Sequence, residues 1–377
     1  MSVEERDIEI KVRPEGRTFA VRLFYRGEHV SGLWIHDLTV HFGRGVRLRM
    51  GGIGGVGTKE EYRMRGFARR VMEFSNGWML ENGFDIAALF GIRDFYERWG
   101  YAPALPEFWL AVDVRYLPDE PKLKVVPYSD EHREAVVELY ERNNEGRMCS
   151  VARAVEFWKG FSKGTSFRVE ADPVVLLDGE GKVRGYISFD ATGERANVAE
   201  VGYSDGSVCE SMAAAMRRRA EERGHGEVWL AIPPDHPFAI YLRRFGCRAS
   251  ATFNRSGGGM MRIINLKTTF DRMAPELERR LKRSGMWGWE GEFYVKTDIG
   301  TLRLRVSRGR VKAEPTDKAG DERLELPQSK LTQLLVGYRT VEDLSLDDDV
   351  FVSPGLIPLL SALFPPLNPY IWWSDRF

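Results

Sequence analysis

The residues best suited to binding a phosphate lie between positions 51 and 70, which read GGIGGVGTKEEYRMRGFARR. Glycines from Gly52 to Gly57 match Gly-x-Gly-x-x-Gly, a dinucleotide fingerprint that works only in the turn between a strand and the next helix. No apolar helical stripe follows Gly57 directly, and Glu60 and Glu61 would place two carboxylates at the pyrophosphate. The dinucleotide site is therefore the weaker of two interpretations.

The second interpretation rests on the loop that precedes a helical pattern. Apolar residues recur from Phe67 to Trp78 at spacings that place them on one helix face, and Gly83 predicts the end of that helix. Backbone N–H groups at a helix N-terminus beside arginines suit a pyrophosphate, and Gly66 lets the chain approach it. The alternative is a helix start with solvated arginines. The loop comprises Arg63, Met64, Arg65, Gly66, Phe67, Ala68 and Arg69.

The segment after this helix adds a strand and a tyrosine. The apolar run 84–90 has the length of a buried strand, and residues 94–101 predict one or two helical turns stopped by glycine. Tyr96 stands four residues before Gly100. From the pattern alone, this residue could be a core aromatic with a hydrogen-bonded hydroxyl.

Composition limits the class of protein. The chain has 377 residues, 55 basic and 55 acidic side chains and three cysteines, Cys149, Cys209 and Cys247. Zero net charge favours neither nucleic acid nor an anionic membrane as a partner. Three widely spaced cysteines predict neither disulfides nor a metal site, and no apolar run is long enough to span a bilayer. We therefore expect a soluble cytoplasmic protein of two or three domains without a metal.

An internal repeat indicates that one fold occurs twice. The stretch from Glu81 to Tyr101 is echoed by Glu222 to Cys247, with Tyr241 in the place of Tyr96. The second copy has no arginines before its helix and carries Asp205 instead. An anion site there would be poor, so we expect the second copy to bind no cofactor.

The last third of the chain has a different pattern. An amphipathic stretch at 273–281 is followed by alternating runs at 291–297 and 302–306, which predict antiparallel strands. The run 331–338, LTQLLVGY, predicts a helix with a glycine cap. Linkers divide the chain into expected domains 1–118, 119–266 and 267–377.

These features together resemble the Eis (enhanced intracellular survival) family of GNAT acetyltransferases over nearly the whole chain. The resemblance implies an α+β fold with two tandem GNAT mixed-sheet domains, the second degenerate, and a sterol-carrier-protein-like α/β domain. It also implies that two strands of the first domain splay around acetyl-CoA, that the acceptor is an amine of a small molecule or a lysine, and that the chain forms a homo-oligomer, often a hexamer. Implied cofactor contacts are Val56, Gly57 and Thr58 for the pantetheine, the loop Arg63 to Arg69 for the pyrophosphate, and Gly91 and Ile92.

The same resemblance implies two catalytic groups. Tyr96 would protonate the departing thiolate, and the terminal carboxylate of Phe377 would receive the amine proton. Large aromatics in the last eight residues independently predict a packed tail. Two departures from the family put polycationic acceptors in doubt: no helical pair separates residues 8–12 from 18–26, and Arg376 would place a cation beside the amine.

Alternatives to a small-amine acetyltransferase remain at this stage. A protein lysine acetyltransferase would use the same chemistry. A non-catalytic carrier of hydrophobic ligands could be built on the last domain, and a dinucleotide enzyme would use the glycine run.

Overall fold

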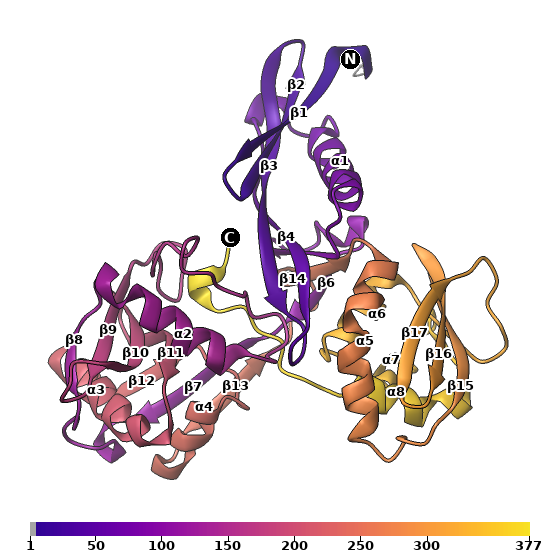
Figure 1. Cartoon of the computed structure of the whole chain (residues 1–377). Coiled ribbons are helices and arrows are strands. Elements are labelled where there is room, and N and C mark those ends of the chain that lie inside the picture. Colours follow the sequence, from indigo (N-terminus) through magenta and orange to yellow (C-terminus); the bar gives the residue numbers. More distant parts are fainter. Residues whose placement is uncertain (1–4) are drawn as a thin grey trace. The chain divides into compact units, whose positions relative to one another are not determined.

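The computed structural model describes residues 5–377, which build three sheets (Figure 1). They divide into two compact units: one comprises the chain up to Leu105, residues 254–369 and Phe377, and the other comprises residues 106–253 and 370–376. The first unit holds two of the sheets and the second unit holds one. Each unit is described by itself below.

The first sheet has the order β1-β2-β3-β4-β5-β14-β6. A hairpin of β1 and β2 opens it, paired from Ile8 with Tyr25 to Glu15 with Thr18, and the described chain has no helix between these strands. The expected absence of a helical pair there is confirmed. The strands are β1 (Ile8–Glu15), β2 (Thr18–Tyr25), β3 (Glu28–His41), β4 (Arg47–Thr58), β5 (Ile86–Gly91), β6 (Ala102–Leu105) and β14 (Gly258–Ile263).

Helix α1 (Phe67–Glu81) covers one face of this sheet. Its apolar stripe of Phe67, Val71, Phe74 and Trp78 packs with Val21, Leu33 and Ile35 from β2 and β3. The helix ends at Glu81 with Asn82 as its C-cap, and Gly83 follows with a φ of 74°, as the sequence predicts. This packing fixes which side chains of β2 to β4 point toward α1 and which point to the other face.

Strands β4 and β5 run parallel for a short distance and then part. They pair only from Met50 with Ile86 to Ile53 with Leu89, although β4 continues to Thr58. The ladder between β4 and β3 is also interrupted, because Gly32 pairs with Gly57 and Trp34 with Gly54. Gly55 and Val56 therefore form a β-bulge, in which Gly55 has a φ of 60°.

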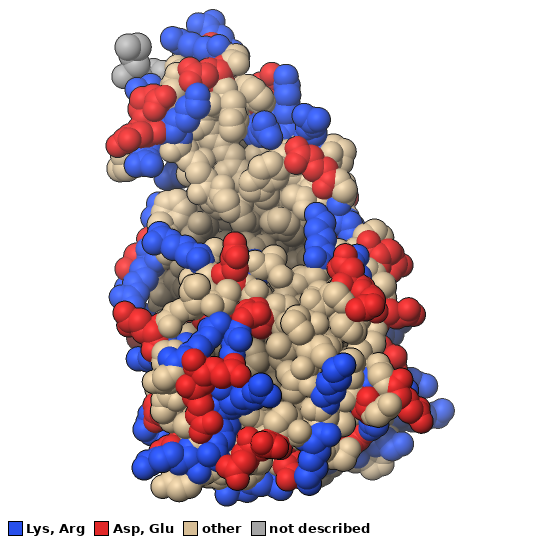
Figure 2. Space-filling view, turned by 90° about the vertical axis from the view of Figure 1, so that its left-hand side faces the viewer, with Lys and Arg blue, Asp and Glu red and all other residues tan. Residues whose placement is uncertain are grey.

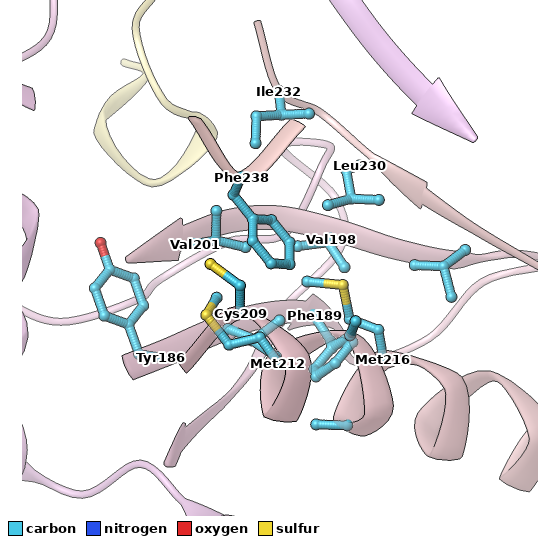
Figure 3. Packing of buried hydrophobic residues seen from close by; sticks show 14 of the residues in the cluster. Tyr186, Phe189, Val198, Val201, Cys209, Met212, Met216, Leu230, Ile232 and Phe238 are labelled. Carbon is cyan, nitrogen blue, oxygen red and sulfur yellow. The ribbon is translucent and has the colours of Figure 1, made fainter. Parts of the chain in front are cut away.

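The second sheet, in the order β13-β7-β12-β11-β10-β9-β8, forms the other unit. Its core packs Met212 and Met216 of α3 (Cys209–Glu222) against Phe189, Val198 and Phe238 (Figure 3). The strands are β7 (Glu107–Asp113), β8 (Lys124–Pro127), β9 (Ala171–Leu177), β10 (Val183–Asp190), β11 (Ala196–Tyr203), β12 (Glu227–Leu230) and β13 (Arg248–Thr252). The remaining helices are α2 (Arg133–Asn144) and α4 (Pro237–Leu242).

The third sheet, in the order β17-β16-β15-β18-β19, belongs to the first unit with the longest helix, α5 (Leu266–Lys282). The predicted strand at 291–297 and the predicted helix with a glycine cap are confirmed as β15 and α6. The elements are β15 (Gly291–Thr297), β16 (Gly300–Ser307), β17 (Arg310–Pro315), β18 (Arg323–Glu325), β19 (Phe351–Val352), α6 (Gln328–Leu335), α7 (Val341–Leu344) and α8 (Ile357–Leu363).

Two strands are exchanged relative to their order along the chain. Strand β14, which follows residues 106–253, lies between β5 and β6 in the first sheet. Strand β7, which directly follows β6, lies between β13 and β12 in the second sheet. The division into ranges 1–118, 119–266 and 267–377 stays a prediction, but each of the first two sheets needs chain from both sides of residue 118.

Basic and acidic side chains are interspersed over the face shown in Figure 2. This distribution agrees with the formal net charge of zero. Within the described residues, no helix is long and apolar enough to cross a membrane.

Candidate functional site

The loop before α1 presents the start of the helix without a side-chain cap. Gly66 is the N-cap residue and has a φ of 81°, which favours glycine. Arg63 and Arg65 are exposed beside it, and their guanidinium groups have no carboxylate partner in the described part of the chain. The guanidinium of Arg65 lies 5.3 Å from the ring centre of Tyr62. Uncapped N–H groups and unpaired cations make this end of α1 suitable for a pyrophosphate.

The glycines of the dinucleotide-like pattern lie within β4 rather than in a turn. A Cβ added at Gly52 would lie 2.8 to 2.9 Å from ring atoms of Phe377, and one added at Gly54 would lie 3.3 Å from its main-chain carboxyl carbon. The absent side chains thus make room for the last residue. The dinucleotide interpretation is wrong, because its glycines line a strand surface and do not precede the helix directly.

Two residues of β3 that the sequence did not single out lie opposite the glycines that contact Phe377. Trp34 and His36 are paired with Gly54 and Gly52 across the β3–β4 ladder. The ring centres of His36 and Phe377 are 5.8 Å apart, and Thr18 Oγ1 lies 3.1 Å from His36 Nδ1. The period-two spacing of Trp34 and His36 could have placed both on one strand face, but nothing in the sequence links them to residue 377.

Tyr96 is buried and packs against the end of β5. A Cβ added at Gly91 would lie 2.5 Å from Cδ2 and Cε2 of the Tyr96 ring, so Gly91 makes room for that ring, while Ile92 is 67% exposed. Burial raises the pKa of the Tyr96 phenol. The hydroxyl therefore keeps its proton at neutral pH, as an acid must.

The turn that holds Tyr96 is fixed by the start of β14. The main-chain N–H of Asp94 donates to Ser256 Oγ at 2.6 Å, and Ser256 is buried. Its hydroxyl also donates to the Glu97 carboxylate. These bonds connect residues on both sides of Tyr96 to a segment about 160 positions later, which the sequence pattern does not reveal.

A cavity of about 430 Å³ opens on the face of the first sheet that lies away from α1. It is lined by β2, β3 and the end of β4, including Arg22, Gly32, Trp34 and Gly57. Gly55, Gly57 and Thr58 contribute to its wall, and they belong to the part of β4 that no longer pairs with β5. The cavity therefore adjoins the point at which the two strands part.

The chain's tail is anchored within the second unit. Arg153 is buried and donates to both carboxylate oxygens of Glu200 at 2.7 Å and to Asp375 at 2.9 and 3.0 Å. Trp372 is buried, and its Nε1 donates to Asn144 Oδ1 at 2.7 Å. The predicted packing of the tail is confirmed.

The expectation for Arg376 is wrong. Its guanidinium is buried in the second unit and donates two hydrogen bonds of 2.8 Å to the Glu107 carboxylate. A bidentate pair of this kind satisfies the cation. Arg376 thus gives no reason to exclude cationic acceptors.

In the second unit, the segment before α3 corresponds to the loop before α1, but it carries an acidic side chain in place of the arginines. The Asp205 carboxylate accepts from Ser207 N at 2.9 Å and from Arg184 Nη2 at 2.8 Å, immediately before α3. Hydrogen bonds from Ser207 and Arg184 hold the pKa of this carboxyl below its usual range. An anion of the chain itself therefore occupies this position.

Comparisons with known proteins agree with this architecture. Residues 3–104 match the model of an acetyltransferase (GNAT) domain, and residues 294–372 match that of a sterol carrier protein domain. No curated protein matches the sequence.

Solved structures share the fold over almost the whole chain. A probable N-acyltransferase from Enterococcus faecalis V583 has 17% identity and a TM-score of 0.76, with 96% of this chain and 90% of that chain covered. A GCN5-related N-acetyltransferase from Anabaena variabilis has 19% identity and a TM-score of 0.72 over 96% and 90%. Eis1 from Mycobacterium abscessus has 16% identity and a TM-score of 0.67 over 97% and 92%. The chain thus combines an acetyltransferase domain of the GNAT type, a second GNAT-like sheet and a sterol-carrier-protein-like domain in an α+β architecture shared with Eis1.

Proposed function

We propose that the protein transfers the acetyl group of acetyl-CoA to a primary amine by direct attack, with Phe377 as base and Tyr96 as acid. The observation that carries the proposal is the position of the Phe377 carboxyl carbon against Gly54. Gly54 is the first residue of β4 beyond its pairing with β5. A carboxylate at this point would face a thioester held between the parting strands.

Acetyl-CoA would lie along the unpaired end of β4. Its pyrophosphate would bind the uncapped N–H groups of α1 and the cations of the loop, from Arg63 through Met64, Arg65, Gly66, Phe67 and Ala68 to Arg69. Its pantetheine would pass Val56, Gly57 and Thr58, where the bulge releases main-chain groups from the ladder with β3. Gly91 and Ile92 lie at the end of the opposite strand, and Gly91 contributes by seating the Tyr96 ring.

The reaction needs one proton removed and one supplied. The neutral amine attacks the thioester carbonyl, whose oxygen would be polarised by main-chain N–H groups near Val56. A carbon–nitrogen bond forms as the carbon–sulfur bond breaks, the Phe377 carboxylate takes a proton from nitrogen, and the Tyr96 hydroxyl gives one to the coenzyme A thiolate. Solvent then returns the proton from the carboxylic acid to the tyrosinate, so that both groups are restored.

His36 is a second candidate for the base. Its Nε2 would lie 3.4 Å from a Cβ added at Gly54, the same point that lies 3.3 Å from the Phe377 carboxyl carbon. The two groups are thus close enough to exchange a proton directly or through one water. An experiment on the base must therefore vary them separately.

The test compares the chain ending at Phe377, verified by intact mass, with a chain extended by two glycines. Extension converts the carboxylate to a neutral amide, so turnover of amines should fall by about 10² to 10⁴ while acetyl-CoA affinity is kept. His36→Gln is the matched variant with the carboxylate intact, and it should lose less. If the extended chain turns over as fast as the native one, Phe377 is not the base; if His36→Gln alone abolishes turnover, His36 is.

The second sheet is proposed to bind no cofactor, because Asp205 already supplies an anion at its helix start. A lysine side chain of a protein is the alternative acceptor to a small amine. Lysine-containing peptides therefore belong in the same panel of acceptors. A homo-oligomer, such as a hexamer, is likewise a proposal that rests on the resemblance.

A further inference from the structure

The face of the first sheet on which the cavity opens consists of ordered rows of residues across the strands. Opposed residues of antiparallel strands share a face. One row contains Thr18, His36 and Gly52; the next contains Ala20, Trp34 and Gly54; the third contains Arg22, Gly32 and Gly57. All three rows lie on the face away from α1, and adjacent rows are about 7 Å apart along the strands.

Phe377 occupies the first two rows, and the cavity opens over the third. The ring of Phe377 lies against Gly52 and its carboxyl carbon against Gly54. In the third row, Arg22 stands beside two glycines, and the His29 imidazole lies over Gly32, where its Nε2 would be 3.2 Å from an added Cβ. Arg22, His29 and both glycines line the cavity. The Arg22 guanidinium lies 5.7 Å from the ring centre of Trp34.

The charged residues lining the cavity are basic. They are Arg22 and Lys59, and no aspartate or glutamate is among the described residues of the lining. Lys59 is paired with Glu28 at 2.6 Å, whereas the carboxylate that pairs with Arg22, that of Glu15, lies 4.0 Å away, at the limit of an ion pair. Arg22 is thus the cation most available to a ligand.

We propose that this cavity is the acceptor site and that it selects amines carrying an anionic group, a carboxylate or a phosphate, several bonds from the nitrogen. This inference rests on the acetyltransferase function proposed above. The anion would pair with Arg22, the chain of the acceptor would lie along Trp34, and the amine would reach the Phe377 carboxylate one row away. A second cation on the acceptor would meet Arg22 and be repelled.

The experiment uses acceptors that differ only at the end remote from the amine. With the full chain and acetyl-CoA, kcat/KM is measured for 6-aminohexanoate, hexylamine and 1,6-diaminohexane, and for 6-aminohexyl phosphate to separate phosphate from carboxylate. We expect kcat/KM for 6-aminohexanoate to exceed that for hexylamine by about 2- to 5-fold, the range of a partly exposed ion pair, and the diamine to be the poorest acceptor. Preference for the diamine would overturn the proposal.

Substitution of Arg22 assigns the preference to this residue. In Arg22→Gln the ratio of kcat/KM for 6-aminohexanoate to that for hexylamine should fall to about one, through KM, and in Arg22→Lys it should largely be kept. Lys124→Gln, an exposed cation of the second unit, is the control and should change neither ratio nor rate. An unchanged ratio in Arg22→Gln would overturn the assignment.

Two further outcomes distinguish the possible failures. If Arg22→Gln weakens acetyl-CoA binding in calorimetry instead of changing acceptor preference, the cavity holds part of the cosubstrate and the inference is wrong. If none of the amines is acetylated while acetyl-CoA binds, the proposed acceptor class and the inference both fail. If all amines are acetylated equally, the inference alone fails.

Discussion

The two GNAT-like sheets use the same opening between parallel strands in opposite ways. In the first sheet, Ile53 is the last residue of β4 that pairs with β5, and β4 continues beyond it. Gly55 lies two positions after Ile53. In the second, β11 runs on past Val198, its last residue paired with β12, and two positions later stands Glu200. The position after the opening thus has no side chain in the first sheet, where it is Gly55, and a buried carboxyl group in the second sheet, where it is Glu200.

The second opening is occupied by the chain's own tail. Glu200 is joined through Arg153 to Asp375, and the Tyr370 hydroxyl donates at 2.7 Å to the carbonyl of Ala231, immediately after β12. Asp205 lies at the helix start of the same unit, where its carboxylate accepts from Ser207 N. Under the function proposed above, these groups would stand where the first unit holds the pantetheine and the pyrophosphate. The comparison teaches that the same opening between parallel strands can be left free in one copy of a fold and be filled by a segment of the chain itself in the other.

The largest expected effect concerns that anchor. Arg153→Met would leave Glu200 and Asp375 buried without their cation, which should destabilise the second unit by about 3 to 5 kcal/mol. Hydrogen exchange on β11, followed by mass spectrometry, measures the change. Arg115→Met, which removes an exposed partner of Asp113, is the control and should have little effect. Equal exchange in both variants would mean that the cluster does not hold the tail.

Next in size is the difference between the two helix starts. Gly66→Glu should raise the Kd of acetyl-CoA at least about 100-fold, because it adds a carboxylate where N–H groups await an anion. Gly206→Glu, at the corresponding place before α3, should leave calorimetric binding at one site per chain. Gly66→Ala controls for backbone strain at the φ of 81°. Two bound acetyl-CoA molecules per chain would mean that the second unit also binds the cosubstrate.

Tyr96 and Tyr241, which occupy corresponding positions in the two copies, should also differ in their effect on catalysis. Tyr96→Phe should keep acetyl-CoA affinity and lower kcat by roughly 10- to 100-fold, since the hydroxyl is needed when the thiolate leaves. Tyr241→Phe, its counterpart in the second unit, should leave kcat unchanged. Steady-state kinetics with one amine measures both. A normal kcat in Tyr96→Phe would point to water as the acid.

The smallest effect is a pH dependence of the second unit. Burial lowers the pKa of His236 well below 6.5, and its Nδ1 accepts from Phe238 N at 3.2 Å. Below about pH 6.5 the unfolded chain binds a proton that the folded chain resists, so stability is lost as pH falls, by up to about 1.4 kcal/mol per unit. His236→Asn keeps a side chain that can cap α4 and should remove this dependence of the unfolding free energy on pH. Urea unfolding between pH 5 and 7 measures the dependence. His225→Asn is the control and should leave it unchanged.

Local features were predictable from sequence, whereas the completed site was not. Helix α1, its uncapped start and the following strand come from short-range periodicity and glycine placement, and they appear where the pattern places them. The role of Gly52 could not be recognised, because its neighbour Phe377 is more than 300 residues away. The burial of Arg376 depends in the same way on Glu107, a partner from another strand. Contacts between residues so far apart produce no periodic pattern that could be recognised in a single sequence.

The exchange of β7 and β14 sets an order of events during synthesis. Strand β6 is held in the first sheet only through β14, which begins about 150 residues after β6 ends. At roughly 5 to 20 residues per second, a ribosome needs on the order of 10 to 30 s to supply β14. During that interval β5 presents an unpaired edge, and a nascent chain or a fragment ending at residue 118 would be open to association with other strands.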